Sequence, residues 1–563
     1  MKSDPNTPRF NTVGRFVRSP SFLLTLATTI VGVMVFRSDV WMGDAEITEP
    51  WISSHAWDNW LPSQCWSIAK SVGGDAAWVY RIWNVLALWL LGLTAFGVAG
   101  EFLDLAGKLS TVIRNRLALS AGLLVVAHPL AGMSACVIAN LDWQLTVLFS
   151  LFAAKIAWNF MRRPAPAGML GLLLCVVFAD LCAPTGMLLA LGGIWVVWRL
   201  AAQTQRAEVK AWATARTGWG TGLTIGGLLV VVWLGADLQN AWTQRSLSQG
   251  GTWVAHWLTQ GRVFLLQFQS LLQPTHLLPE HQFPWSEKWS DWPAVVGLGV
   301  IVMASLVCIL RLFRKTPCPL SALVFLALWP TLLLLGWRTT NLLSEIRWYA
   351  VLPWAAVLAA WGLGWLFSRW PAMSLPIGWG LPAGLMFLTI GQTSRFADST
   401  TMAAHLLKAE PCNVEVRIFV QEKQASHGNL AAVLANSRPF ADAYQTMDIA
   451  NENDPYGRRY DLLDALRYWV QSERNAQIAM ENNYGSEYAQ AFAQASTARF
   501  ITEVQKLALT EPKALPLLSA LIPSPVPPEP PKPRSAPSIP GIPGIPGTTA
   551  KGAGEDGKKE YTR

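Results

Sequence analysis

Four carboxylates follow the first apolar run of the chain within a short distance: Asp39, Asp44, Glu46 and Glu49. A carboxylate can take the proton from an acceptor hydroxyl, and a guanidinium fork suits phosphate. Arg338 and Arg347 offer guanidinium groups later in the chain. Together these residue types could transfer a group from a phosphate-activated donor. Because external loops tolerate carboxylates freely, simple solvation stays an open interpretation, above all for Asp39 and Glu49.

Ionisable residues also occur within or beside apolar runs. His128 and Asp180 lie in such runs, where ionisable groups are expensive and often line a cavity. His128 could equally be a neutral imidazole bonded to a neighbouring helix. Glu345, two residues before Arg347, is a further cavity candidate that could instead pair with other segments. His276 lies in a loop whose spacing does not predict metal ligands, so we expect no protein metal site, although a divalent metal could assist the transfer.

The elements that must position these residues are membrane helices. The chain is 52% hydrophobic and 14% charged, against roughly a quarter charged in an ordinary soluble domain. Apolar runs near the length of about 20 residues that crosses a bilayer predict about eleven spans, with one or two helices in 166–200. The expected spans are 20–36, 78–99, 116–135, 141–160, 166–182, 183–200, 218–236, 292–313, 319–337, 347–369 and 373–392.

Lys and Arg alternate between the connections and predict which side each one faces. They are concentrated in the N-terminus, 1–19, and in every second loop, and these parts are expected in the cytoplasm. The short loops favour a bacterial inner membrane, with the C-terminal domain outside. Since the cations are scattered between apolar runs, the net charge of +8 serves topology, and we exclude nucleic acid as a partner.

Two long external loops, 37–77 and 237–291, distinguish the membrane domain, 20–392. The first is rich in Trp and predicts an amphipathic helix lying in the interface. No internal repeat typical of a transporter relates the two halves. The loops suit an enzyme working at the outer leaflet.

Residues 393–521 predict an external helical domain. A helix ending at Pro411, a new helix from Asn413 and a turn at Gly428 follow the layout of a tetratricopeptide repeat, although a generic helical hairpin fits as well. Either would present a surface to an exported protein. The Pro/Gly-rich tail, 522–563, cannot bury a core and is expected to be disordered.

The cysteines carry no C-x-x-C spacing, which excludes a zinc or redox motif of that kind. Cys136, Cys175, Cys182 and Cys308 lie in apolar runs and predict small buried thiols. Cys65 and Cys412 are then the two that could both face an oxidising compartment.

Three motifs in their order along 20–515 resemble the transmembrane-and-tetratricopeptide protein O-mannosyltransferase family of the GT-C glycosyltransferase superfamily. They are Ala127-His-Pro-Leu130, Leu271-Leu-Gln-Pro-Thr-His-Leu277 and Asn341-Leu-Leu-Ser-Glu-Ile-Arg-Trp-Tyr-Ala-Val-Leu-Pro353. The resemblance implies a GT-C-like fold and transfer of a sugar from a polyprenyl-phosphate donor to an exported protein.

By the same resemblance, the acidic motif of that family falls on Gly43-Asp-Ala-Glu-Ile-Thr-Glu-Pro-Trp-Ile52, which makes Asp44 the catalytic candidate, with Glu46 second. Arg338 and Arg347 would hold the donor phosphate. The stretch lacks the adjacent Asp pair of the family, and Ala179-Asp-Leu181 stands where a Lys-Glu is usual. A second hypothesis is therefore an inactive GT-C-like scaffold or complex subunit that binds partners through 393–521.

Overall fold

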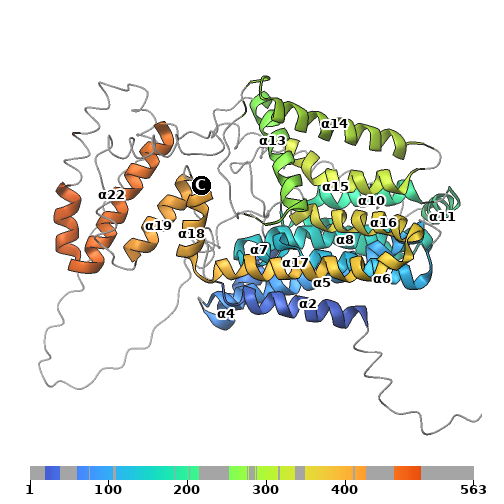
Figure 1. Ribbon diagram of the computed structural model, residues 1–563, viewed down its shortest axis with the longest axis horizontal. Coiled ribbons are helices and arrows are strands. Elements are labelled where there is room, and N and C mark those ends of the chain that lie inside the picture. Colours follow the sequence, from blue (N-terminus) through green and yellow to red (C-terminus); the bar gives the residue numbers. More distant parts are fainter. Residues whose placement is uncertain are drawn as a thin grey trace, which may run out of the picture.

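The protein is an all-helical assembly among the residues that its structure, a computed structural model, describes. The described residues are 19–38, 60–74, 76–105, 109–183, 186–201, 203–214, 253–275, 277, 286, 288–314, 317–336, 349–409, 413–426, 462–495 and 502. Every regular element within these ranges is a helix, as the sequence predicts, and no strand occurs in them. Figure 1 shows a bundle of long, side-by-side helices with a smaller group of helices at one end.

The bundle is made of helices that are apolar along most of their length. Their bounds are α2 Pro20–Val35, α5 Ala77–Leu105, α6 Thr111–Ala127, α7 Pro129–Cys136, α8 Leu141–Arg162, α9 Pro166–Asp180, α10 Gly186–Leu200, α14 Trp292–Leu312, α15 Pro319–Gly336, α16 Leu352–Arg369 and α17 Ser374–Thr393. Short elements link some of them: the 3₁₀ turns η3 Ile138–Asn140, η5 Pro371–Met373 and η6 Ser394–Ala397, and α11 Gln203–Thr214.

Local sequence signals explain where several bundle helices begin. Ser19 accepts a hydrogen bond from the Phe22 amide and Pro20 takes the first helical position of α2. Ser110 caps α6 in the same way through Ile113. Both patterns satisfy an amide that the first helical turn leaves unpaired, so each apolar run starts at a defined residue.

Three described helices are long and apolar enough to cross a membrane, or up to five if each bent pair counts as one span. The three are Ala77–Leu105, Ile138–Arg162 and Trp292–Leu312, and one bent pair is α6 with α7. Several other expected spans are helices that are shorter or less apolar, and 218–236 lies outside the described residues. The run 166–200 is two helices, because the chain turns at 181–183 and Gly186 begins α10.

The bundle has two chemically different ends. We call one of them the basic end. Helix α5 ends there and α6 begins there, and α8, α10 and α14 end there with an arginine in the last turn. Glu101 pairs with Lys155 and Arg162 there, and the Arg199 guanidinium donates to the Leu312 carbonyl at 2.8 Å. Lys and Arg from helices far apart in sequence thus gather at one end of the molecule.

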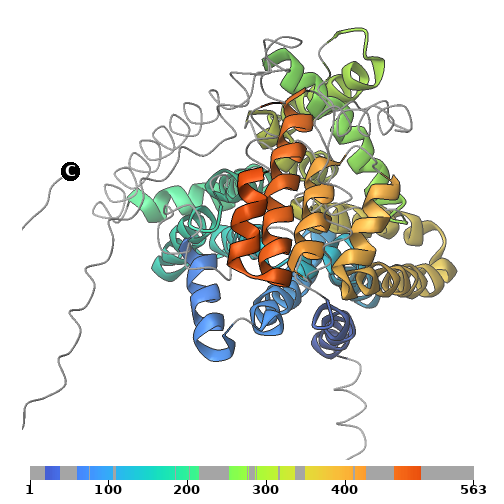
Figure 2. The same ribbon diagram turned by 90° about the vertical axis from the view of Figure 1, so that its left-hand side faces the viewer.

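The opposite end carries α4, Trp60–Gly73, and is called the α4 end below. Figure 2 views the molecule along the bundle, where α2 and α17 appear end-on and α4 lengthwise, so α4 runs across the bundle axis. Trp66 and Ala69 are buried against Val79 and Tyr80 of α5. The sequence predicts an amphipathic helix in this loop, and the described part of it, from Trp60, is one; Trp51 and Trp57 lie outside the described residues.

Helix α13, Trp253–Leu272, crosses the direction of the bundle beside α14 (Figure 1). The two backbones approach closely where glycines meet. A Cβ built on Gly297 would lie 1.9 Å from the Gly261 carbonyl oxygen, and one on Gly261 would lie 2.3 Å from the Ala294 carbonyl oxygen. Small residues at a crossing allow this approach, which van der Waals contacts then stabilise.

The smaller group of helices lies at the α4 end: α18 Ser399–Ala409, α19 Val414–Ser426 and α22 Leu462–Tyr484. Asp398 accepts hydrogen bonds from the Thr401 hydroxyl and from the Thr400 and Thr401 amides at the start of α18. These bonds, that of the Thr401 hydroxyl most of all, lower the pKa of the Asp398 carboxyl. Gln421 bonds Tyr468 across α19 and α22. Helix α18 ends and α19 begins near the predicted break at 411–413.

Candidate functional site at the broken span

Most of the residues that the sequence proposes for catalysis fall outside the described ranges. Those are Asp44, Glu46, His276, Arg338, Glu345 and Arg347. His128 and Asp180 are described, and among the described residues the His128 ring bonds to main-chain groups of Leu130 and Leu271. The site is therefore built from these two residues and from the polar groups that surround them.

His128 lies where the third expected span breaks. Pro129 cannot continue α6, so the helix stops at Ala127 and α7 starts at an angle of 44°. The His128 Nδ1 accepts from the Leu130 amide, and the Nε2 lies 3.2 Å from the Leu271 carbonyl oxygen. These partners assign the proton to Nε2. The imidazole caps α7 and ties it to α13, which favours the structural interpretation of His128.

The break leaves main-chain carbonyls without intrahelical donors, and neighbouring helices supply them. Thr389 of α17 donates its hydroxyl to the Ala127 carbonyl. At the far end of α7, the Arg81 Nε donates to the Cys136 carbonyl at 3.1 Å, and the Asn84 Nδ2 to the Val137 carbonyl at 2.9 Å. Inside a membrane such carbonyls must find partners within the protein, and Arg81 and Asn84 provide them.

Arg81 is 1% exposed although it belongs to a candidate membrane span. Besides the Cys136 carbonyl, its guanidinium donates to the carbonyl of Ser38. Ser38 is the last described residue before the acidic segment. The positive charge also lies at the negative, C-terminal end of the α7 dipole, which is a favourable interaction. Arg81 and Asn84 are not among the residues predicted from the sequence, although one signal marks them: two polar residues, three apart, at the entrance of an apolar run.

Three more polar side chains complete this group, which we call the cap cluster: Arg81, Asn84, Ser134, Asn140 and Gln144. The Ser134 hydroxyl accepts from the Asn140 amide at 2.7 Å and from the Gln144 amide at 3.3 Å. The Asn84 Oδ1 and Gln144 Oε1 atoms are buried and have no hydrogen-bond partner among the described residues. Buried acceptors of this kind are costly, so they suit a water molecule or a ligand hydroxyl.

Asp180 ends α9 near a second group of polar side chains. Cys182 lies in the following turn, and burial first, then the charges of Asp142, Cys65 and Asp180, raise the pKa of the Cys182 thiol. Burial likewise raises the pKa of the Cys65 thiol. We call Cys65, Asp142, Asp180 and Cys182 the thiol–carboxylate group. No three His, Cys, Asp or Glu side chains in the described part of the chain are arranged to hold a metal ion.

The described residues that flank segments 39–59 and 337–348, which contain five of the other catalytic candidates, lie at the α4 end. Segment 39–59 lies between Ser38 and Trp60. Arg81 binds the Ser38 carbonyl, and the amide of Leu61, the residue after Trp60, donates to the Leu181 carbonyl at 3.2 Å. Segment 337–348 follows α15, whose Leu332 packs with Phe264 and Val351. Both ends of each segment are therefore anchored in the same region of the molecule.

Two of the three sequence motifs meet in space. The His128 ring contacts Leu271, and the Gln392 side chain at the end of α17 donates to the Thr275 carbonyl at 2.8 Å. These contacts join the bend of the broken span, the end of α13 and the end of α17. Residues far apart in the sequence thus form one framework beneath the α4 end.

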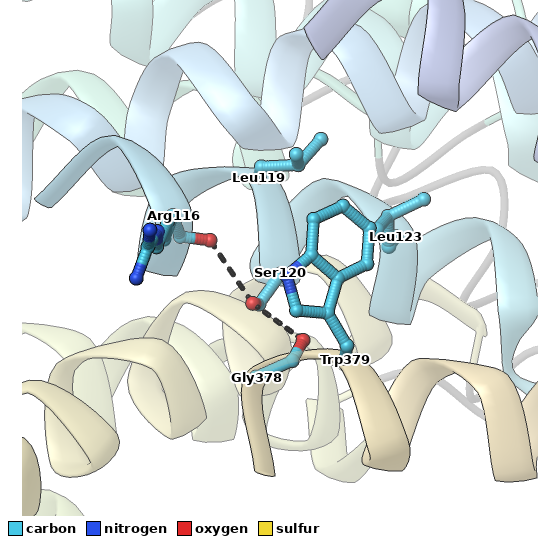
Figure 3. A pocket seen from close by; sticks show the side chains of 6 residues that line it. All are labelled: Arg116, Leu119, Ser120, Leu123, Gly378 and Trp379. Atoms are coloured by element: carbon cyan, nitrogen blue, oxygen red, sulfur yellow. Dashed lines mark hydrogen bonds between the residues drawn. The ribbon is translucent and has the colours of Figure 1, made fainter. Parts of the chain in front are cut away.

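A small pocket elsewhere in the molecule is unrelated to this framework. Figure 3 shows it between α6 and α17, lined by Arg116, Leu119, Ser120, Leu123, Gly378 and Trp379. The Ser120 hydroxyl bonds the Arg116 and Gly378 carbonyl oxygens, both at 3.0 Å, and so ties the two helices. Because Arg116 lies in the first turns of α6, the pocket is near the basic end. None of the residues that the sequence proposes for catalysis lines it.

The fold and the site define the class of the protein only as an all-helical protein with candidate membrane spans. Comparisons with family models, with curated proteins and with solved structures each found no match.

Proposed function

We propose that the protein is a membrane glycosyltransferase that moves a sugar from a polyprenyl-phosphate donor to an exported protein. The observation that carries this proposal is the convergence at the α4 end. The cap cluster, Asp180 and the anchored ends of segments 39–59 and 337–348 all lie there. The described residues that flank the segments with the proposed carboxylates and arginines therefore lie in one region, which supports transfer from a phosphate.

The charge distribution supports working at the outer leaflet of a bacterial inner membrane. Arginines gather at the basic end, and short basic connections face the cytoplasm in membrane proteins. With the basic end inside, the α4 end and helices α18, α19 and α22 face outward. The remaining features of an eleven-span GT-C-like domain with an external repeat domain belong to the same proposal.

In the proposed reaction Asp44 takes the proton of the acceptor hydroxyl, with Glu46 in support. The bond between the sugar and the donor phosphate breaks as the bond to the acceptor oxygen forms. Arg338 and Arg347 stabilise the charge that develops on the departing phosphate. The external helices hold the acceptor protein close to the membrane surface.

The second candidate function is a scaffold without catalysis. It is favoured by a specific observation: Arg81, Asn84 and His128 each bond main-chain groups. These polar residues would then stabilise the main chain around the broken span, while α18, α19 and α22 bind partner proteins.

Glycan analysis of envelope proteins separates the two functions. Cells lacking the protein and cells with Asp44→Asn should lose the same glycan, because the carboxylate that accepts the proton is absent in both. Asp39→Asn is the matched control, since Asp39 is expected to be solvated, and it should keep the glycan. If neither deletion nor Asp44→Asn changes any glycan, while deletion disrupts a membrane complex, the protein is the scaffold.

A further inference from the structure

Two cysteines from distant parts of the chain lie at the α4 end. Cys65 belongs to α4, and Cys182 lies in the turn between α9 and α10. The Leu61 amide donates to the Leu181 carbonyl at 3.2 Å, which joins the first turn of α4 to this turn. Cys65 lies one helical turn beyond Leu61 on α4, and Cys182 directly follows Leu181.

The environment of the two thiols supports their proximity. Cys182 is completely buried and Cys65 is partly buried, and neither is in a disulfide in this structure. The charges that bear on Cys182 are those of Asp142 on α8, Asp180 on α9 and Cys65 on α4. Since no three such groups among the described residues are arranged for a metal, a thiol pair is the chemistry that this arrangement offers.

We propose that Cys65 and Cys182 form a disulfide that ties α4 to the turn between α9 and α10. The sequence had placed Cys182 inside an apolar run and left Cys412 as the partner available to Cys65. The turn at 181–183 changes this, because it brings Cys182 to the same end of the bundle as Cys65.

The oxidation proceeds by exchange with a disulfide-bearing oxidant, such as a thiol oxidase protein. The thiolate of Cys65, the more exposed of the two, attacks one sulfur of that disulfide and releases the first thiol of the oxidant. The thiolate of Cys182 then attacks Cys65 in the mixed disulfide and releases the second thiol. The pair loses two electrons and two protons, and the oxidant gains them as two thiols.

The chain contains a second cysteine pair that serves as an internal control. Cys308 lies near the end of α14 and Cys318 lies just before α15, so both are at the basic end. Disulfides persist in oxidising compartments and are rare in the cytosol. The two ends of one molecule therefore report on opposite sides of the membrane.

The test is differential alkylation of the full-length protein in cells grown without added oxidant. Cells are quenched with acid, dissolved in denaturant with a first alkylating reagent, then reduced and treated with an isotopically distinct second reagent. Mass spectrometry of the unreduced sample should find the peptide of Cys65 joined to that of Cys182. Both residues should carry the second label in most molecules, while Cys308 and Cys318 carry the first.

Three variants sharpen the result. Cys412→Ser should leave the Cys65–Cys182 peptide unchanged, whereas Cys65→Ser and Cys182→Ser should each move the remaining cysteine to the first label. The first label on both cysteines in the unmutated chain overturns the proposal, and so does a Cys65–Cys412 peptide. Because the mapping in the unmutated chain decides the question, a variant that fails to fold does not affect the test.

Discussion

Arg81 is a buried charge that has a definite task in the fold. Its guanidinium bonds main-chain oxygens of Ser38 and Cys136, which belong to the ends of α2 and α7. An arginine inside a membrane span is costly, so it persists where several carbonyls need a donor. The residue couples the shape of the broken span to the start of the acidic segment.

Replacing Arg81 by Leu should therefore destabilise the protein by about 2–6 kcal/mol, because two buried carbonyls each lose a donor and an unsatisfied carbonyl costs roughly 1–3 kcal/mol. Arg81→Lys should have a stability between those of the unmutated protein and Arg81→Leu, since an ammonium keeps the charge but lacks the planar fork. Denaturant unfolding of the purified protein in detergent, followed by circular dichroism, measures the free energy.

The control for this substitution is Arg114→Gln at the basic end. Arg114 pairs with Asp104, with the side chains 32% and 40% exposed, and exposed pairs contribute about 0–1 kcal/mol. Equal losses in Arg81→Leu and Arg114→Gln would show that the main-chain bonds of Arg81 contribute little.

At the scale of residues the sequence predicts some of the site and misses the rest for a physical reason. Ionisable groups in apolar runs attract attention, so His128 and Asp180 could be named from the sequence. A bond from His128 to a neighbouring helix was one of the interpretations from the sequence, but its partner could not be identified, because Leu271 lies far along the chain. The role of Arg81 could not be predicted, since its partner Cys136 belongs to another helix and has a free carbonyl only because the span breaks.

At the scale of elements, the crossing of α13 and α14 depends on glycine. Gly297→Ala should destabilise the protein by about 1–3 kcal/mol, the usual cost of overpacking, because the new Cβ meets the Gly261 carbonyl at 1.9 Å. Gly299→Ala is the matched control on the same helix, since nothing lies within 4 Å of its Cβ. Unfolding in detergent should separate the two variants, and equal stability would mean that the crossing adjusts without cost.

The elements themselves were largely predictable because apolar runs mark them directly. The expected spans 78–99, 141–160 and 292–313 correspond to α5, α8 and α14, which are long and apolar enough to cross a membrane. The sequence could not decide whether 166–200 is one helix or two. That choice depends on a turn in which the Gly186 amide bonds the Ala183 carbonyl, and the apolar composition conceals it.

At the scale of the whole molecule, the proposed orientation can be measured. Asn115 lies in the first turns of α6 at the basic end, and Glu481 is exposed on α22 at the other end. In spheroplasts, a membrane-impermeant maleimide should label Glu481→Cys and leave Asn115→Cys unlabelled until the membrane is opened. The unmutated chain gives the background, and the reverse pattern would contradict the proposed orientation.

Helices α9 and α10 have 15 residues each, whereas α5 has 29. At about 1.5 Å per residue, the short pair reaches roughly 22 Å, and a bilayer core is about 30 Å thick. Leu170, Leu174 and Val177 of α9 are exposed and form an apolar outer face. A helix shorter than the bilayer core is accommodated by thinning of the surrounding bilayer. In a membrane, the protein would be flanked on its α9 side by a thinner bilayer, which brings the two leaflet surfaces closer together there than beside α5.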